Sequence, residues 1–124
     1  MKYDFVLTEV GILYKSSIDF FEKASQLRRL SRDEEKECAR LMKNGDVEAR
    51  LKIIDSYIPY VASFVKRTSE PMQSLELIYR CLYTLEKQVD VFDFQVDGEP
   101  FVRRLGRVLR MVLTRYIAEK QLIY

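Results

Sequence analysis

The stretch LELIYRCLYTLEKQVDVFD, residues 75 to 93, decides the fold. Its apolar residues recur at alternating steps of three and four, which places them on one face of an α-helix with about 3.6 residues per turn. These residues are Leu75, Ile78, Leu82, Leu85, Val89 and Phe92. The opposite face carries Glu76, Tyr79, Arg80, Tyr83, Lys87 and Asp90. We therefore expect a helix that buries one side and displays two tyrosines on the other.

The composition is that of one folded domain. The chain has 124 residues, 48% of them apolar, and its four glycines and three prolines leave room for few loops. No apolar run reaches the roughly 18 residues of a membrane-spanning helix, and the N-terminus does not read as a signal peptide. We expect a cytoplasmic protein without membrane contact.

The residue types that most often perform catalysis are scarce. The chain has no histidine, the commonest general base and metal ligand. Cys38 and Cys81 fall within helical patterns, where buried free thiols are a simpler interpretation than a disulfide. No nucleophile–base pair, glycine-rich phosphate loop or zinc spacing is present. We therefore expect no enzyme activity, no catalytic residue, no metal site, no cofactor and no small-molecule substrate.

The N-terminal third also has helical patterns. Residues 4 to 14 favour a short helix, although their β-branched residues leave a strand open. Ser16 or Ser17 is expected to cap a second helix that runs to about Leu30. The inward positions of that helix are expected to be Ile18, Phe21, Ala24 (or Ser25), Leu27 and Leu30.

Polar residues mark the ends of the next helices. Ser31 and Glu34 fit a capping box, and Asn44-Gly45 is expected to stop the helix near Lys43. Asp46 is expected to cap the following helix, which continues to about Lys66 or Arg67. Because a proline in a helix interior costs about 3 kcal/mol, Pro59 predicts a break or kink near residues 55 to 57, with Ser56 as a fresh cap. Ser74 is the expected cap of the helix quoted first.

A basic helix follows an acidic loop at residues 94 to 100. It is expected to run from about Phe101 to about Ile117 or beyond. Its apolar face consists of Leu105, Val108, Leu109, Val112 and Tyr116. Arg103, Arg107 and Arg110 lie on the opposite face, with Arg104 and Arg115 on a flank. Since no strand pattern is convincing, the fold class is all-α, a compact helical bundle.

The charges are segregated along the chain. The net charge is +2, but residues 70 to 100 carry −5 and residues 101 to 124 carry +5. Guanidinium groups at i, i+4 and i+7 can follow a phosphate backbone, which makes the basic helix a candidate for nucleic-acid contact. A solvated face, or one paired with the acids of residues 86 to 99, is an equally open interpretation. The lack of aromatic residues on that face argues against base stacking.

Two tyrosines mark a candidate protein interface. Tyr79 and Tyr83 lie one turn apart beside Arg80 and Lys87, and aromatic and arginine residues are enriched at interfaces. The alternative, of equal weight, is that one or both rings lie against the N-terminal helix.

The order of these pieces resembles a known family. Residues 30 to 67 resemble the start of the core domain of bacterial RNA polymerase sigma factors of the sigma-70 type, regions 1.2 to 2. The family's capped acidic helix, Gly-Asp turn, Ala-Arg helix and Ile-acid step appear here as Leu30-Ser31, Gly45-Asp46, Ala49-Arg50 and Ile54-Asp55. The helix quoted first is similar to the family's polymerase-binding helix, and Gly98 and Phe101 match the start of the next one.

The resemblance implies a sigma region 2-like helical domain at residues 30 to 124, preceded by an N-terminal helical extension at residues 1 to 29. With the patterns above, it implies a sigma-like transcription regulator that binds the coiled coil of the polymerase largest subunit, or a partner sigma or regulator protein, and contacts duplex DNA. The expected partner contacts are Glu76, Tyr79, Arg80, Tyr83, Glu86 and Lys87. The expected DNA contacts are Arg103, Arg104, Arg107, Arg110, Thr114 and Arg115.

Several positions depart from the family's pattern. Arg80 reverses the charge of a polymerase-binding position. Arg104, Arg107 and Val108 stand where the family has a tyrosine and two tryptophans, and Met111 replaces a glutamine that contacts bases. Because a stacked base gains about 1–3 kcal/mol, this loss implies weak strand opening with phosphate contact retained. The alternative function is a protein-interaction module, such as a sigma mimic that titrates a regulator, without DNA binding.

Overall fold

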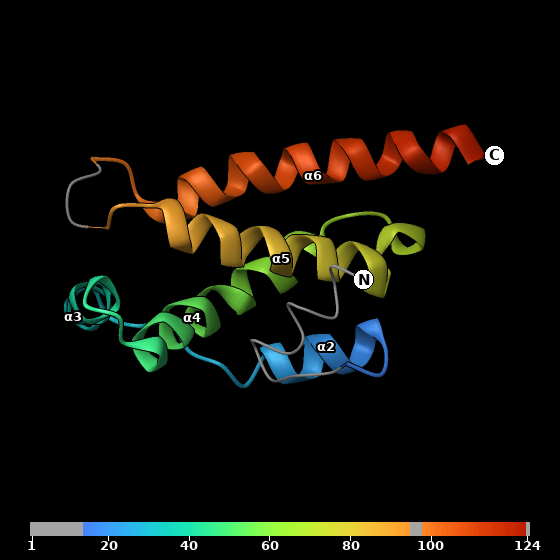
Figure 1. The fold of residues 1–124 in the computed structure, drawn as a ribbon. Coiled ribbons are helices and arrows are strands. Elements are labelled where there is room, and N and C mark those ends of the chain that lie inside the picture. The colour runs from blue at the N-terminus through green and yellow to red at the C-terminus, as the bar shows by residue number, and fades with distance from the viewer. Residues whose placement is uncertain (1–13, 95–97, 124) are drawn as a thin grey trace.

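Every regular element in the part of the chain that the structure describes is a helix. The computed structural model describes residues 14–94 and 98–123 (Figure 1). Its α-helices and one short 3-10 helix are α2 (Ser17–Ala24), α3 (Arg32–Lys43), α4 (Val47–Lys66), η1 (Glu70–Met72), α5 (Leu75–Val91) and α6 (Phe101–Ile123). The all-α prediction is confirmed.

Helix α5 lies between two other layers. It packs against α4 on one side and α6 on the other, while α2 and α3 both pack on α4 (Figure 1). The apolar stripe expected for α5 is confirmed, since Ile78, Leu85 and Val89 are fully buried. Leu75, at the start of the helix, is half-buried against the same core. The fold is thus built outward from residues 75–92.

The predicted caps form where the sequence places them. Ser31 Oγ accepts the N–H of Glu34 at 3.1 Å, and the Glu34 carboxylate accepts the N–H of Ser31 at 2.9 Å. At the next two helices the cap is one-sided: Asp46 accepts the N–H of Ala49 in α4, and Ser74 accepts that of Leu77 in α5. Gly45 takes a φ of +89°, a conformation that favours glycine, and turns the chain between α3 and α4. These local signals fix the starts of three helices.

Helix α2 corrects two predictions. It begins after its cap Ser16, as expected, but ends at Ala24 rather than near Leu30. Its buried residues are Phe20 and Ala24, whereas Ile18 is 68% exposed. The reason is that burial of the large Phe20 ring, whose centroid lies 4.9 Å from that of Tyr14, sets the rotation of this short helix.

The predicted break near Pro59 is wrong, because α4 runs without interruption from Val47 to Lys66. Ser56 is buried inside it, and its hydroxyl donates to the Ile53 carbonyl at 2.7 Å instead of capping a new helix. Ile58 and Val61 beside the proline are fully buried. Burial of such side chains, worth about 1.5–3 kcal/mol each, offsets the roughly 3 kcal/mol cost of the proline.

The two cysteines are free and buried, as predicted. Burial raises the pKa of the Cys81 thiol to about 12. The expected helix or strand at residues 4–14 lies outside the described residues except for Tyr14, which is buried in the common core. The division of the chain after residue 29 stays a prediction, and α2 shares its core with the helices that follow.

Candidate nucleic-acid and protein interface

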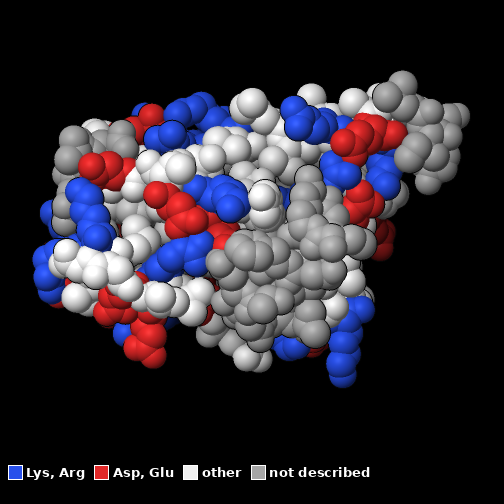
Figure 2. Space-filling view, in the orientation of Figure 1, with Lys and Arg blue, Asp and Glu red and all other residues white. Residues whose placement is uncertain are grey.

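The arginine face of α6 is exposed. We use this name for Arg103, Arg107, Arg110, Thr114 and Arg115, all of which are exposed to solvent. Figure 2 shows blue side chains along the upper edge of the molecule, where α6 runs, with white side chains between them. The spacing follows from the burial of Phe101, Leu105 and Leu109, which turns the intervening residues outward. The expected face therefore exists.

Among the described residues, one arginine of this face forms a salt bridge. Arg107 Nη1 lies 2.5 Å from Glu99 Oε1, and this contact lowers the pKa of the Glu99 carboxyl. Within residues 14–94 and 98–123, no salt bridge joins Arg103, Arg110 or Arg115 to an acid. Direct pairing with an acid thus holds for Arg107, while Glu99 and Glu119 attract Arg103 and Arg115 without a salt bridge. A row of exposed guanidinium groups, most of them without a salt bridge, is suited to binding anions.

Two predicted DNA contacts, Arg104 beside the face and Thr114 within it, have side chains that bind inside the protein. Arg104 is half-buried, and its guanidinium carbon lies 5.6 Å from the centre of the Phe92 ring. It therefore covers the aromatic cluster at the start of α6 rather than projecting from the arginine face. The Thr114 hydroxyl donates to the Arg110 carbonyl at 2.9 Å, so its oxygen remains available only as an acceptor.

Two of the predicted partner contacts instead join α5 to α6. Arg80 Nη2 lies 2.8 Å from Glu76 Oε2 and 2.6 Å from Glu119 Oε2, and Lys120 Nζ lies 3.0 Å from Glu76 Oε1. We call Glu76, Arg80, Glu119 and Lys120 the α5–α6 latch. Its cations lower the pKa of both carboxyls, chiefly Lys120 for Glu76 and Arg80 for Glu119. The latch directs these four charges toward one another rather than toward a partner.

Glu86 was expected at the partner surface, but the structure places it in the core. It is 1% exposed, and its Oε1 accepts from Arg50 Nη2 at 2.9 Å. The same guanidinium donates from Nε to Asp90 at 2.7 Å, so one arginine of α4 joins two acids of α5. Glu86 is one position beyond the buried Leu85, and Arg50 draws it inward. This position is therefore a correction to the predicted docking face.

The sequence left open whether Tyr79 and Tyr83 form a partner interface or pack against the N-terminal segment, and the two tyrosines differ in this respect. The Tyr79 hydroxyl donates to the Tyr14 carbonyl at 3.2 Å, and the two rings stack with centroids 6.4 Å apart. Tyr79 thus lies against the N-terminal segment. Tyr83 is half-buried, and the ammonium of the exposed Lys87 lies 5.3 Å from its ring centre. Of the six predicted partner contacts, Lys87 is the exposed one, and Tyr83 lies beside it.

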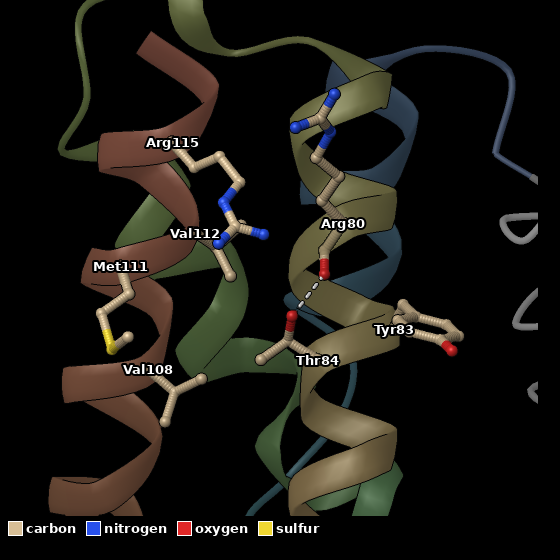
Figure 3. A pocket seen from close by; sticks show the side chains of 7 residues that line it. All are labelled: Arg80, Tyr83, Thr84, Val108, Met111, Val112 and Arg115. Atoms are coloured by element: carbon tan, nitrogen blue, oxygen red, sulfur yellow. Dashed lines mark hydrogen bonds between the residues drawn. The ribbon is translucent and has the colours of Figure 1, made fainter. Parts of the chain in front are cut away.

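A groove of about 290 Å³ between α5 and α6 was not predicted. In Figure 3, Val108, Val112 and Arg115 point from α6 toward α5, and Thr84 points back from α5. Arg80 borders the groove, but its guanidinium points along α5 away from it (Figure 3). Met111, 70% exposed, stands on the α6 side. The signal in the sequence was the apolar Met111 among the arginines of α6.

The described residues contain no group of three or more His, Cys, Asp or Glu side chains that could hold a metal ion. No helix among them is both long and apolar enough to cross a membrane. The described surface presents guanidinium, aromatic and apolar groups.

Comparison with known proteins supports a sigma-70-like domain. The chain is similar to the RNA polymerase sigma factor SigA of Clostridium acetobutylicum, with 32% identity over 102 residues. The alignment covers 82% of this chain and 27% of that protein, so the chain spans about a quarter of the length of this curated relative. No protein-family model and no solved structure matches the chain.

Proposed function

We propose that this chain is a sigma-like transcription regulator that binds RNA polymerase or a partner sigma subunit and contacts duplex DNA through the arginine face of α6. The observation that carries the DNA contact is the exposed row of guanidinium groups, of which Arg103, Arg110 and Arg115 have no salt bridge within the described residues. The similarity to a sigma factor supports a role in transcription.

The chemistry of the face favours phosphate contact over base stacking. Arginines one turn apart lie about 5–6 Å apart along a helix, which allows them to engage neighbouring phosphates. The aromatic residues near the start of α6 pack on one another, and Phe92 and Phe101 are 7% and 3% exposed. Their rings are not available to an unpaired base. We therefore infer binding to duplex DNA with little capacity to hold an opened strand.

The partner contact is proposed to centre on Tyr83 and Lys87. Both are at the surface of α5, whereas Glu76 and Arg80 already bind α6. Docking on the coiled coil of the polymerase largest subunit, or on a partner sigma or regulator protein, would therefore use fewer α5 charges than the sequence alone implies. Tyr83→Ala is expected to reduce co-purification with purified polymerase core at least about tenfold, because aromatic anchors dominate interface energies.

DNA binding is tested by measuring the fluorescence anisotropy of a labelled duplex at several salt concentrations. The variant Arg103→Ala/Arg107→Ala/Arg110→Ala removes three candidate phosphate contacts. Since each contact contributes about 0.9 to the slope of log K against log salt, the slope is expected to flatten by between 2 and 3, approximately. The affinity at low salt is expected to fall by at least about a hundredfold.

A charge-matched variant separates a local contact from net charge. Lys36→Ala/Lys52→Ala/Arg67→Ala removes three exposed cations from α3, α4 and the residue after α4. It is expected to bind DNA within about threefold of the original protein. Equal losses in the two triple variants, or no binding by the original protein, would overturn the DNA contact. A co-purifying partner without DNA affinity would then favour the alternative, a protein-interaction module, for which the exposed Met111 is the supporting observation.

A further inference from the structure

An apolar strip interrupts the arginine face. Met111 is 70% exposed, and Val108 and Val112 are half-buried beside it on the same side of α6. Exposed apolar surface is unfavourable in water at about 25 cal/mol per Å². A phosphate backbone does not remove that cost, because it offers charged oxygens where Met111 needs an apolar neighbour. The strip is therefore a candidate binding surface for a ligand other than DNA.

Hollows lie on both sides of Met111. The α5–α6 groove, about 290 Å³ in volume, is lined by Tyr83, Thr84, Val108 and Val112 among others. A second, shallower hollow on the outer side of α6 is lined by Arg107, Arg110, Met111, Thr114, Arg115 and Ala118. Met111 and Arg115 line both hollows. Met111 is thus a ridge with room on either side for apolar side chains, and the flexible thioether can adapt to their shape.

The charged residues that line the two hollows are all arginines, and the described lining includes no acid. Two of these arginines already have partners nearby, since Arg80 binds Glu76 and Glu119 and Arg107 binds Glu99. Arg110 and Arg115 lack salt bridges within the described part of the chain. Because a matching surface must place carboxylates opposite these groups, the ligand is expected to be apolar along its centre and acidic along its edge.

We propose that the α5–α6 groove and the Met111 ridge bind an acidic amphipathic helix of a partner protein. Its apolar side chains surround Met111, and its carboxylates contact Arg107, Arg110 and Arg115. A helix is the matching shape because α5 and α6 lie side by side (Figure 1) and side chains from both line the groove, against which a third helix can pack. Acids one turn apart on that helix can meet Arg107 and Arg110, which lie one turn apart on α6.

Such a helix and duplex DNA would compete for the same guanidinium groups. Arg107 and Arg110 belong to the arginine face that we propose to contact phosphates, so occupation of the ridge blocks them. This regulatory consequence rests on the proposed DNA contact, whereas binding of the helix itself does not. The inference therefore supplies a mechanism by which a partner protein switches DNA binding off.

The test uses a fluorescein-labelled synthetic helix of about 16 residues, long enough for partial helicity. It carries leucines at i, i+3, i+4 and i+7 and glutamates on the flanks. Its scrambled form has the same composition without an apolar stripe. Anisotropy with the full-length chain is expected to give binding at least about tenfold tighter for the patterned peptide. The unlabelled patterned peptide is expected to displace a labelled duplex.

Two single variants separate the ridge from the DNA contact. Met111→Ala keeps every charge and adds no polar group, and it is expected to weaken peptide binding about tenfold while leaving duplex affinity within about twofold. Arg103→Ala lies outside both hollows and is expected to weaken duplex binding several-fold with no change for the peptide. Failure of the duplex to bind at all would overturn the competition but not the groove.

Equal binding of the two peptides, or peptide binding that Met111→Ala leaves unchanged, would overturn the groove as a helix-binding site. Met111 and Arg103 are both exposed, and thermal unfolding of each variant checks that the fold is intact. The groove is supported if both variants keep the original unfolding temperature, the Met111 variant loses peptide binding and Arg103→Ala loses duplex binding.

Discussion

Helices α5 and α6 both carry rows of charged side chains at helical spacing, but they use them differently. On α5 the charges meet partners inside the protein, as Glu86 does with Arg50 and Arg80 does with Glu119. On α6, Arg103, Arg110 and Arg115 have no salt bridge within the described residues. The spacing of charges along a helix therefore does not tell whether they are available to bind another molecule. That depends on which acids the neighbouring helices bring close.

The largest effect is expected from removing the cation that binds Glu86 of α5. Arg50→Met leaves a carboxylate that is 1% exposed without its guanidinium partner. Because an uncompensated buried charge is costly, the free energy of unfolding is expected to fall by about 3–5 kcal/mol, measured by urea denaturation. This loss would show that the acids of α5 serve the fold.

A double variant checks the cause of that loss. Arg50→Met/Glu86→Leu replaces the pair with apolar side chains, and it is expected to recover most of the stability, since a buried ion pair often contributes little net energy. Arg110→Ala removes an exposed arginine of α6 and is expected to change stability by less than about 0.5 kcal/mol. Equal effects of Arg50→Met and Arg110→Ala would contradict the difference between the two helices.

The latch provides a smaller and more local test. Arg80→Ala removes the guanidinium that binds Glu76 and Glu119 and lies 5.2 Å from the Tyr116 ring centre. We expect a loss of about 1 kcal/mol, concentrated in the C-terminal half of α6. Hydrogen exchange of amides 116–121 is expected to accelerate about fivefold, while exchange in the first half of the helix stays the same.

Acid should weaken the same latch. The pKa values of Glu76 and Glu119 are held below their usual 4.5 by Lys120 and Arg80 respectively. A lowered folded-state pKa means that the stabilisation is present above pH 4.5 and is lost as the pH falls through the lowered values. Exchange of the last turns of α6 should therefore accelerate in that range. The latch would be contradicted if the exchange rate of these amides did not rise at low pH, or if Arg80→Ala left its pH dependence unchanged.

The sequence predicted much of the fold because the decisive signals were local. The caps at Ser31, Asp46 and Ser74 need only the first turn of their own helix, and the stripe of α5 needs only the helical period. The predicted break at Pro59 failed because burial on neighbouring helices outweighed the cost of the proline. Helix α2 was too short for its period to decide between Ile18 and Phe20 as the buried position.

The site was less predictable because it depends on residues distant in the sequence. Arg50 lies 36 positions before Glu86, and Glu76 lies 44 positions before Lys120, so neither pairing has a local pattern. The arginine face was found because it needs only α6 itself. The groove required α5 and α6 to be placed side by side, although the apolar Met111 among arginines was a visible clue.

The smallest effect concerns the arginine of the face that does have an acid beside it. Glu99→Gln removes the carboxylate 2.5 Å from Arg107 and makes this arginine resemble Arg110. If the difference between the helices lies in compensation of charge, duplex affinity at low salt is expected to rise about two- to fivefold, and the salt slope to steepen by up to about 0.9. Glu22→Gln changes the net charge equally on α2, a helix that packs on α4 rather than on α6, and is expected to leave both quantities nearly unchanged. Equal gains from both variants would mean that duplex affinity depends on the net charge of the protein rather than on whether Arg107 is paired.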